Sequence, residues 1–448
     1  MSLKLLRRVM PVCLLLVLAS VAHAGLLPDS TFSDGWRLAN GLEVRARHVP
    51  RASGVAISVA YRAGSLYEPA QREGLADLLA ELEFLAPAGD TPERTRDEMA
   101  SIRPLGWAIK VNEHVAVLTE VASVPTFAGV LHQVAVRMRG VTVTDAALRA
   151  ALATVKETQG ARRFGTADHS LYHRVRDLAL GRTDEQILRR AGSKALDGIA
   201  TKDAQDRLRA LYVPANAVLS IAGDLSSADL RRIVESEFAA IPGGTATPEA
   251  LEPVLRSALH TSPWTGLNQR AAIVGVISPA LSDSLHPAFY LASLVAGAYM
   301  RDAYGAPAAP LTTRFQYSLL DEPDLVRFYP AVGSDTTTAA GVAAEFTNKL
   351  DRFADTAVER NIMDQVRYNV LWMLGGLLSP SLARRAQEEP SVLTALTSSM
   401  ATRALWRGDA FWDPYRDRFE RTTLGHTIFV PWMSAPEHQV VLEFTPRR

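Results

Sequence analysis

The chain of 448 residues repeats one order of structural elements twice, and this repeat constrains the fold more than any single motif. Each half is expected to run strand, helix, strands, helices and strand, with only faint similarity between the residues themselves. A segment rich in Pro, Gly and Thr, 239–254, lies between them, as is typical of linkers between domains. Strand pairs beside runs of helices predict an α+β fold of two homologous domains. Each domain would be an antiparallel-rich sheet packed with helices, not a doubly wound sheet.

Several short segments carry this prediction. Asn40-Gly41 is a strong turn dipeptide and predicts a hairpin around it. Alternation of apolar and polar residues over 55–61 is typical of a half-buried strand, and a second strand pair is expected around Asn112-Glu113. A strand, a Gly-Asp turn and a helix capped by Ser226 or Ser227 are expected over 217–238.

The charges of the chain balance, with 48 basic and 48 acidic residues, and the basic residues do not cluster. Nucleic acid is therefore not an expected partner.

The first 24 residues have the pattern of a cleaved signal peptide. Lys4, Arg7 and Arg8 precede a short apolar run, and a small-residue cleavage site follows at 22–24. The chain is therefore predicted to be exported, to the periplasm, and an uncleaved anchor is the alternative. Cys13 is the only cysteine and lies in this segment, so the mature chain would have neither disulfides nor thiolate metal ligands.

The stretch GLADLLAELEF, 74–84, predicts a helix with a stripe of leucines on its core face. Asp77, Ala80 and Glu81 fall on the opposite side. On a later predicted helix, Glu157 also falls opposite the core stripe. Periodicity favours two solvated acidic faces. The alternative is that Asp77, Glu81 and Glu157 converge, and such an all-oxygen site would suit Ca²⁺ or Mg²⁺ better than zinc.

The longer run YRAGSLYEPAQREGLADLLAELEF resembles the start of the insulinase and pitrilysin-type metallopeptidases, the family with an inverted zinc motif. Members show an apolar strand, a G-S-x-x-E-P loop and then G-L-A-H-x-x-E-H-x-x-F. Two later stretches, NAVLSIAGDLSSADLRRIVESEFAAIP and TTRFQYSLL, are similar to further family landmarks in the same order. The resemblance thus covers nearly the whole mature chain. The residues that match the first frame are Gly64, Ser65, Glu68, Pro69, Gly74, Leu75, Ala76 and Phe84.

The resemblance implies a zinc site, but this chain departs from it at most positions. In the family two histidines four residues apart bind zinc from one helix face, and here Asp77 and Glu81 replace them. The glutamate between them polarises the zinc-bound water, and here it is Ala80. Glu157 matches the third ligand, a glutamate on a later helix. With one of four positions kept, we predict no catalytic residue and no bound metal in this chain.

The resemblance also implies substrate-binding residues in the second half, but the match there is weaker. The resemblance implies an arginine and a tyrosine that hold substrate near the zinc of the active chain. Tyr317 matches the tyrosine, whereas Pro310 stands at the arginine position and Arg314 lies nearby. Tyr317 and Arg314 are therefore candidate substrate contacts, and a packed strand tyrosine is the alternative. His169 and His173, four residues apart, form a pair without an obvious third ligand.

The resemblance also implies an architecture and a function. Two related domains, here 25–240 and 265–448 joined by a linker at 241–264, would form half of a clam-like chamber. We predict a non-catalytic subunit of an exported heterodimeric zinc peptidase, which shapes the chamber and binds peptide or unfolded protein. Zinc would sit in the active partner, a homologue with an intact motif. The alternatives are an autonomous envelope scaffold or peptide-binding protein and, less expected, a peptidase with unorthodox metal ligands.

Overall fold

The computed structural model describes residues 33–446 except nine short gaps within them. The predicted signal peptide, 1–24, lies outside the described residues. Among the described residues, no helix combines the length and the apolar character needed to cross a membrane. The gaps are 165–166, 184–185, 187–193, 265–269, 304–313, 330–337, 355–359, 376–379 and 423–428, and residues 447–448 are also outside.

The first sheet has six strands in the order β1-β2-β6-β3-β5-β4. All neighbours are antiparallel except β2 and β6, which run parallel. The predicted hairpin joins β1 to β2, and Gly41 at its turn takes a φ of 91°, a region that favours glycine. The strands are β1 (Ser33–Arg37), β2 (Glu43–His48), β3 (Val55–Tyr61), β4 (Trp107–Val111), β5 (Ala116–Ala122) and β6 (Ala217–Gly223).

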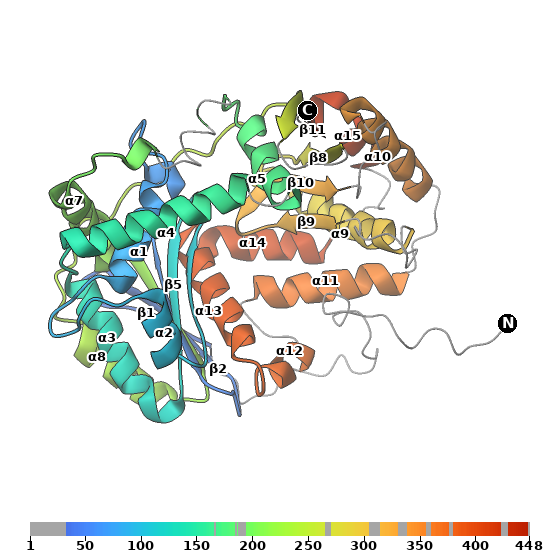
Figure 1. Cartoon of the computed structure of the whole chain (residues 1–448). Coiled ribbons are helices and arrows are strands. Elements are labelled where there is room, and N and C mark those ends of the chain that lie inside the picture. Colours follow the sequence, from blue (N-terminus) through green and yellow to red (C-terminus); the bar gives the residue numbers. More distant parts are fainter. Residues whose placement is uncertain are drawn as a thin grey trace.

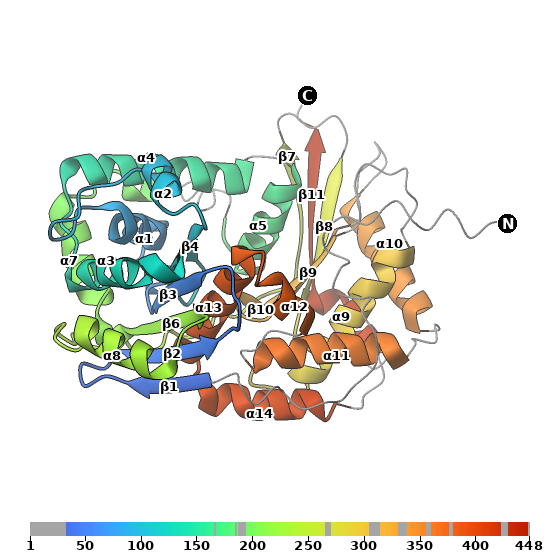
Figure 2. The ribbon, with the colours of Figure 1, turned by 90° about the horizontal axis from the view of Figure 1, so that it is seen from below.

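Helices that connect or follow these strands pack on one face of the first sheet and bury the leucine stripe that the sequence predicts (Figure 2). Ser226 caps α8, because its hydroxyl accepts a hydrogen bond from the backbone N–H of Asp229 at 3.3 Å, as expected for one of the two candidate serines. These helices are α1 (Leu75–Leu85), α2 (Arg96–Ile102), α3 (Phe127–Arg139), α4 (Asp145–Phe164), α7 (Thr201–Leu211) and α8 (Ser227–Phe238).

The second sheet has five strands in the order β7-β11-β8-β10-β9, with the last strand of the chain, β11, between β7 and β8 (Figure 2). Helices α9, α10, α11, α14 and α15 build the second core with it. The strands are β7 (Ala258–Trp264), β8 (Ala271–Ile277), β9 (Arg314–Ser318), β10 (Glu322–Tyr329) and β11 (Gln439–Pro446). The helices are α9 (His286–Ala303), α10 (Ala339–Ala354), α11 (Arg360–Leu374), α14 (Asp409–Glu420) and α15 (Val430–Ser434).

The predicted linker, 241–264, needs a correction, because β7 occupies its last seven residues. β7 pairs in parallel with β11, from Val440 opposite Ala258 to Pro446 opposite Trp264. Its partner strand lies at the far end of the chain, so no local pattern announces it. β7 is also an edge strand that leaves Leu259 65% exposed and contains Pro263, a residue that edge strands tolerate.

The two halves exchange helices. Helix α5 (Ala167–Ala179), from the first half, packs on β8 and β11 of the second sheet. Helix α13 (Pro390–Leu405), which follows the short α12 (Pro380–Arg385), packs on β3, β5 and β6 of the first sheet. Figure 1 shows α13 beside β5, and α5 beside β8 and β10. Each sheet is thus covered on its second face by a helix of the other half.

This exchange overturns one expectation for β3. The alternating pattern predicts a half-buried strand, but all seven residues of β3 are buried. Its second face presents Ala56, Ser58 and Ala60, which are small enough to let α13 approach closely. The hydroxyl groups of Ser58 and Thr397 of α13 lie 2.7 Å apart. The α+β fold of two helix-packed sheets is otherwise as predicted.

Candidate functional site

Helix α1 is held by the loop that precedes it. The carboxylate of Glu68 accepts hydrogen bonds from the backbone N–H groups of Gly74, at 2.9 Å, and Ala76, at 3.0 Å. These groups at a helix N-terminus have no partner within the helix. Gly74 takes a left-handed φ of 93°. A Cβ on Gly64 would lie 2.4 Å from the carbonyl oxygen of Glu113. The landmarks of the resemblance therefore have structural reasons that do not depend on zinc.

The two ligand positions of α1 are occupied by engaged carboxylates. Glu81 is 5% exposed and forms an ion pair with Arg96 of α2, whose Nε lies 3.3 Å from Glu81 Oε2. The guanidinium of Arg96 in turn lies 5.3 Å from the centre of the Trp107 ring. Burial raises the pKa of Glu81, and Arg96 opposes this shift only in part. Asp77, half-buried, accepts a hydrogen bond from Gln159 of α4 at 2.6 Å.

The third position does not join the other two. Helix α4 packs on α1 through its core stripe, which contains Val155 and then Gln159, while Glu157 points to solvent. Ala80 is completely buried and Glu81 is only 5% exposed. The side of α1 opposite the leucines is therefore not a solvated acidic face, and that expectation is wrong for α1. The reason is that α2 and α4 cover the side opposite the leucines. Within the described part of the chain, no three His, Cys, Asp or Glu side chains are placed to hold a metal ion.

One carboxylate on α1 escaped the sequence prediction. Glu83 is 2% exposed, and its Oε1 has no hydrogen-bond partner among the described residues. It lines a small cavity with Tyr61 and Arg137. Burial raises the pKa of Glu83 well above its ordinary value, and the charge of Arg137 opposes the shift without cancelling it. The signal was present in the sequence, since Glu83 follows Leu75 and Leu79 at intervals of four and so belongs to the core stripe.

Of the two candidate substrate contacts in the second half, the structure describes the side chain of Tyr317 but not that of Arg314. Tyr317 is half-buried, and its hydroxyl donates a hydrogen bond to the carbonyl oxygen of Pro323 at 2.6 Å. It also lies 3.0 Å from Nε2 of the buried His286. Arg314 begins β9, and its side chain lies outside the described residues. The side chain of His169 does so too, and His173 lies edge-on against the ring of its neighbour Tyr172.

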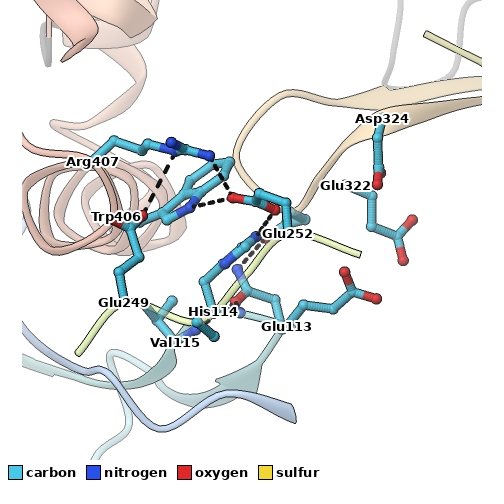
Figure 3. A network of polar contacts seen from close by, with 12 residues as sticks. Glu113, His114, Val115, Glu249, Glu252, Glu322, Asp324, Trp406 and Arg407 are labelled. Atoms are coloured by element: carbon cyan, nitrogen blue, oxygen red, sulfur yellow. Dashed lines mark hydrogen bonds and ion pairs between the residues drawn. The ribbon is translucent and has the colours of Figure 1, made fainter. Parts of the chain in front are cut away.

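The junction between the halves carries a network of polar contacts, which gathers at the turn between β4 and β5 (Figure 3). Glu252 lies between His114 of this turn and Trp406 and Arg407, which follow α13. Its carboxylate is 2.7 Å from Arg407 Nη2 and 3.5 Å from His114 Nε2. The ring of His114 stacks on Trp406 at 4.3 Å. Burial lowers the pKa of His114 despite the nearby carboxylate, which favours the neutral ring.

Arg176 of α5 is the charged centre of the same junction. Arg176 is 5% exposed, and its Nε donates to Glu113 of the β4–β5 turn at 2.8 Å. Nη1 donates to Asp324 of β10 at 2.6 Å, and Glu322 lies within 3.7 Å of Nε. Burial alone would raise the pKa of Glu113, but the charge and hydrogen bonds of Arg176 outweigh it, and the pKa lies below its ordinary value. Helix α5 is thus tied to both halves.

The sequence did not reveal these junction residues. Arg176 and Asp324 are separated by 148 positions, and no local pattern links them. Gln159 could have been found, because it follows Val155 by four residues on the stripe of α4 that was predicted to face the core. Chemically, the site around α1 is therefore a set of paired or buried carboxylates without an open face, while the junction locks the two halves together.

Comparison with known proteins supplies the fold. No family model matches the chain, and no curated protein sequence matches it either. Among solved structures, a protease from Helicobacter pylori is similar with a TM-score of 0.72 and 15% identity, over 93% of this chain and 100% of that chain. The peptidase M16 inactive domain from Pseudomonas fluorescens has a TM-score of 0.66 and 14% identity, over 93% and 98%. The expected fold is thereby confirmed.

A third structure concerns the size of the chain. The periplasmic protease PqqL from Escherichia coli is similar with a TM-score of 0.65 and 13% identity. The similarity covers 94% of this chain but 48% of that one. The chain thus spans about half the length of PqqL and has the fold found in M16 peptidases, including a domain described as inactive.

Proposed function

We propose, for a chain with the fold of the M16 peptidases, that it is the non-catalytic subunit of an exported heterodimeric zinc peptidase. The observation that carries the proposal is helix α1. It keeps the residues that build the helix and its loop, Glu68 and Gly74, while Asp77 and Glu81 are engaged by Gln159 and Arg96. A subunit that supplies wall and peptide-binding surface needs large complementary faces and needs no metal ligands.

Two further facts support this proposal over autonomous catalysis. Ala80 has no proton acceptor where a general base would stand, and it is completely buried. Glu157 points away from α1, so even the ligand position that is kept would not reach a metal there. The similarity to about half of PqqL is in keeping with a chain that needs a second half to enclose substrate. Zinc would then be held by the partner.

The test is to co-express the chain with a homologue from the same genome that carries an intact zinc motif. Co-purification at a one-to-one ratio is expected, with peptide cleavage by the mixture exceeding that of the homologue alone. Replacing the general base glutamate of the homologue by glutamine should abolish cleavage by the mixture. The proposal fails if the mixture is no more active than the homologue alone. It also fails if this chain alone contains stoichiometric zinc and cleaves peptides.

A further inference from the structure

Two buried arginines lie where α13 crosses the first sheet. Arg47 belongs to β2, and Arg403 belongs to the last turn of α13. They are 9% and 7% exposed. In each, the Nε atom is enclosed and has no hydrogen-bond partner in the part of the chain that the structure describes. Within the described residues, no carboxylate forms an ion pair with either guanidinium. Both side chains are thus buried charges without a contacting counter-charge, which is strongly unfavourable.

The acidic groups nearest to this pair are already engaged. Asp409, at the start of α14, lies 2.7 Å from Arg45 Nη1. Asp413 lies 3.8 Å from Arg416 Nη1. Both attract Arg403 from a distance, while Arg45 and Arg416 repel it. The carboxylates of α14 therefore contact Arg45 and Arg416 and act on Arg403 only from a distance, while the guanidinium of Arg403 lies 5.9 Å from the centre of the Trp412 ring.

Both guanidiniums nevertheless stay charged at neutral pH. Burial, followed by repulsion from Arg403, lowers the pKa of Arg47 to about 10. Burial lowers the pKa of Arg403 to about 10 as well, although Asp409 and Asp413 oppose the shift. A group with a pKa of 10 is protonated in all but about one molecule in a thousand at pH 7. Two positive charges, one on a strand of the first half and one on a helix of the second, are thus near enough to repel each other.

We propose that Arg47 and Arg403 bind a small oxyanion, a phosphate or a carboxylate group, between β2 and α13. A guanidinium presents its donors in a planar fork that matches two oxygens of such a group. An anion beside the two guanidiniums would supply the missing counter-charge and would accept hydrogen bonds from their Nη groups, which are not among the enclosed atoms. The residual exposure of both side chains keeps them in contact with solvent. The anion has two possible sources, a free ion or an acidic side chain of a bound peptide.

The experiment measures the urea unfolding midpoint of the full chain against three probes at constant ionic strength set with chloride. The probes are inorganic phosphate, acetate and a hexapeptide of alternating Glu and Gly. Saturable stabilisation is expected, and at 100 times the Kd the ratio of folded to unfolded chain should rise about 100-fold. Stabilisation by phosphate or acetate identifies a free ion, and stabilisation by the peptide alone identifies a side-chain carboxylate. If none of the probes stabilises more than chloride, the proposal is overturned.

Variants separate this site from general salt effects, because phosphate also stabilises folded proteins by exclusion from their surface. Arg47→Met and Arg403→Met should each lose the saturable part of the response. Arg232→Met, which removes a side chain 74% exposed on α8, should keep it. Both test substitutions replace an unpaired charge by an apolar chain of similar length, so folding should be retained. If they respond to the probes as the wild type does, the bound anion lies elsewhere and the proposal is wrong.

Discussion

Helices α5 and α13 both cover the sheet of the other half, but the buried arginine that each carries has different surroundings. Each leaves its own half and covers the sheet of the other, and each brings a buried arginine to the contact. Arg176 of α5 meets Glu113 and Asp324 in direct hydrogen bonds. Arg403 of α13 is repelled by Arg47, lies 5.9 Å from the centre of the Trp412 ring and contacts no carboxylate among the described residues. Burial of the same side chain is thus compensated at one helix and left open at the other.

The comparison distinguishes a buried charge that holds the two halves together from a buried charge that is available to bind an anion. Removing one partner of a buried ion pair is costly because the other charge stays buried, whereas removing an unpaired buried charge relieves the fold. The arginine of α5 therefore belongs to the joint between the halves. The arginines at α13 are present at a cost to stability, and such a cost is more readily understood at a place that binds something. Substitutions at the two helices should consequently change stability in opposite directions.

The largest effect is expected from Arg176→Met. The substitution leaves the carboxylates of Glu113 and Asp324 at the junction without their cation, and the free energy of unfolding should fall by about 3–5 kcal/mol. Urea unfolding followed by circular dichroism measures this loss. Arg232→Met on the exposed face of α8 is the matched control and should change stability by less than about 0.5 kcal/mol. A loss at Arg176 as small as that of the control would show that the junction charges do not hold the halves together.

The opposite sign is expected from Arg47→Met in chloride without added oxyanion. Methionine fills similar space, and the unpaired charge beside Arg403 disappears. The free energy of unfolding should rise by about 1 kcal/mol or more. The same urea titration measures it, and the double variant with Arg176→Met should show the two changes adding, because the sites share no contact. A loss of stability in Arg47→Met would mean that Arg47 has a counter-charge after all.

The exchange of helices between the halves, and the charges at their contacts, could not be predicted from the sequence. Hairpins, the strand around residues 55–61 and the Ser226 cap were predictable because each depends on neighbours within a few positions. The contact of Ser58 with Thr397 joins residues 339 positions apart, and β7 pairs with a strand at the end of the chain. Even so, the small residues on the second face of β3 indicate in the sequence that a helix can pack there.

The site around α1 was predicted in part. The positions equivalent to ligands and base were located because a family frame fixes them in one short stretch. The orientation of α4 was available from periodicity, since a stripe through Val155 continues to Gln159 and leaves Glu157 outside. The burial of Glu81 was not, because it depends on α2 bringing Arg96 across that face. Spacing along a chain thus identified the residues, and packing decided what they contact.

The same contrast between paired and unpaired buried charge exists among carboxylates, and pH can expose it. Glu113 has a lowered pKa because of Arg176, so its contribution to stability is present above pH 4.5 and is lost as the pH falls through the folded pKa. Glu83 has a raised pKa because of burial. The folded state then holds its proton longer than the unfolded state, and stability falls as the pH rises above 4.5 toward the folded pKa.

Glu83→Gln should therefore stabilise the chain at pH 7 and leave it nearly unchanged at pH 4. Glutamine keeps the shape of the side chain and removes the charge. Urea midpoints of variant and wild type at half-unit steps from pH 4 to pH 8 measure the difference, which should grow with pH. Glu157→Gln is the control, since Glu157 is exposed, and its curve should follow the wild type. A constant difference between Glu83→Gln and wild type would show that the effect is one of packing and not of titration.

The smallest effect is expected where α13 meets the sheet without charge. Ser58 contacts the hydroxyls of Thr119 and Thr397, each at 2.7 Å. Thr397 keeps a hydrogen bond to the carbonyl oxygen of Leu393 at 3.0 Å when Ser58 is removed. Ser58→Ala should therefore cost only about 0.5–1.5 kcal/mol. Ser58→Val, which adds volume against α13, should cost more, because the close approach leaves no space for it. Equal costs for the two variants in urea unfolding would mean that α13 does not press on β3.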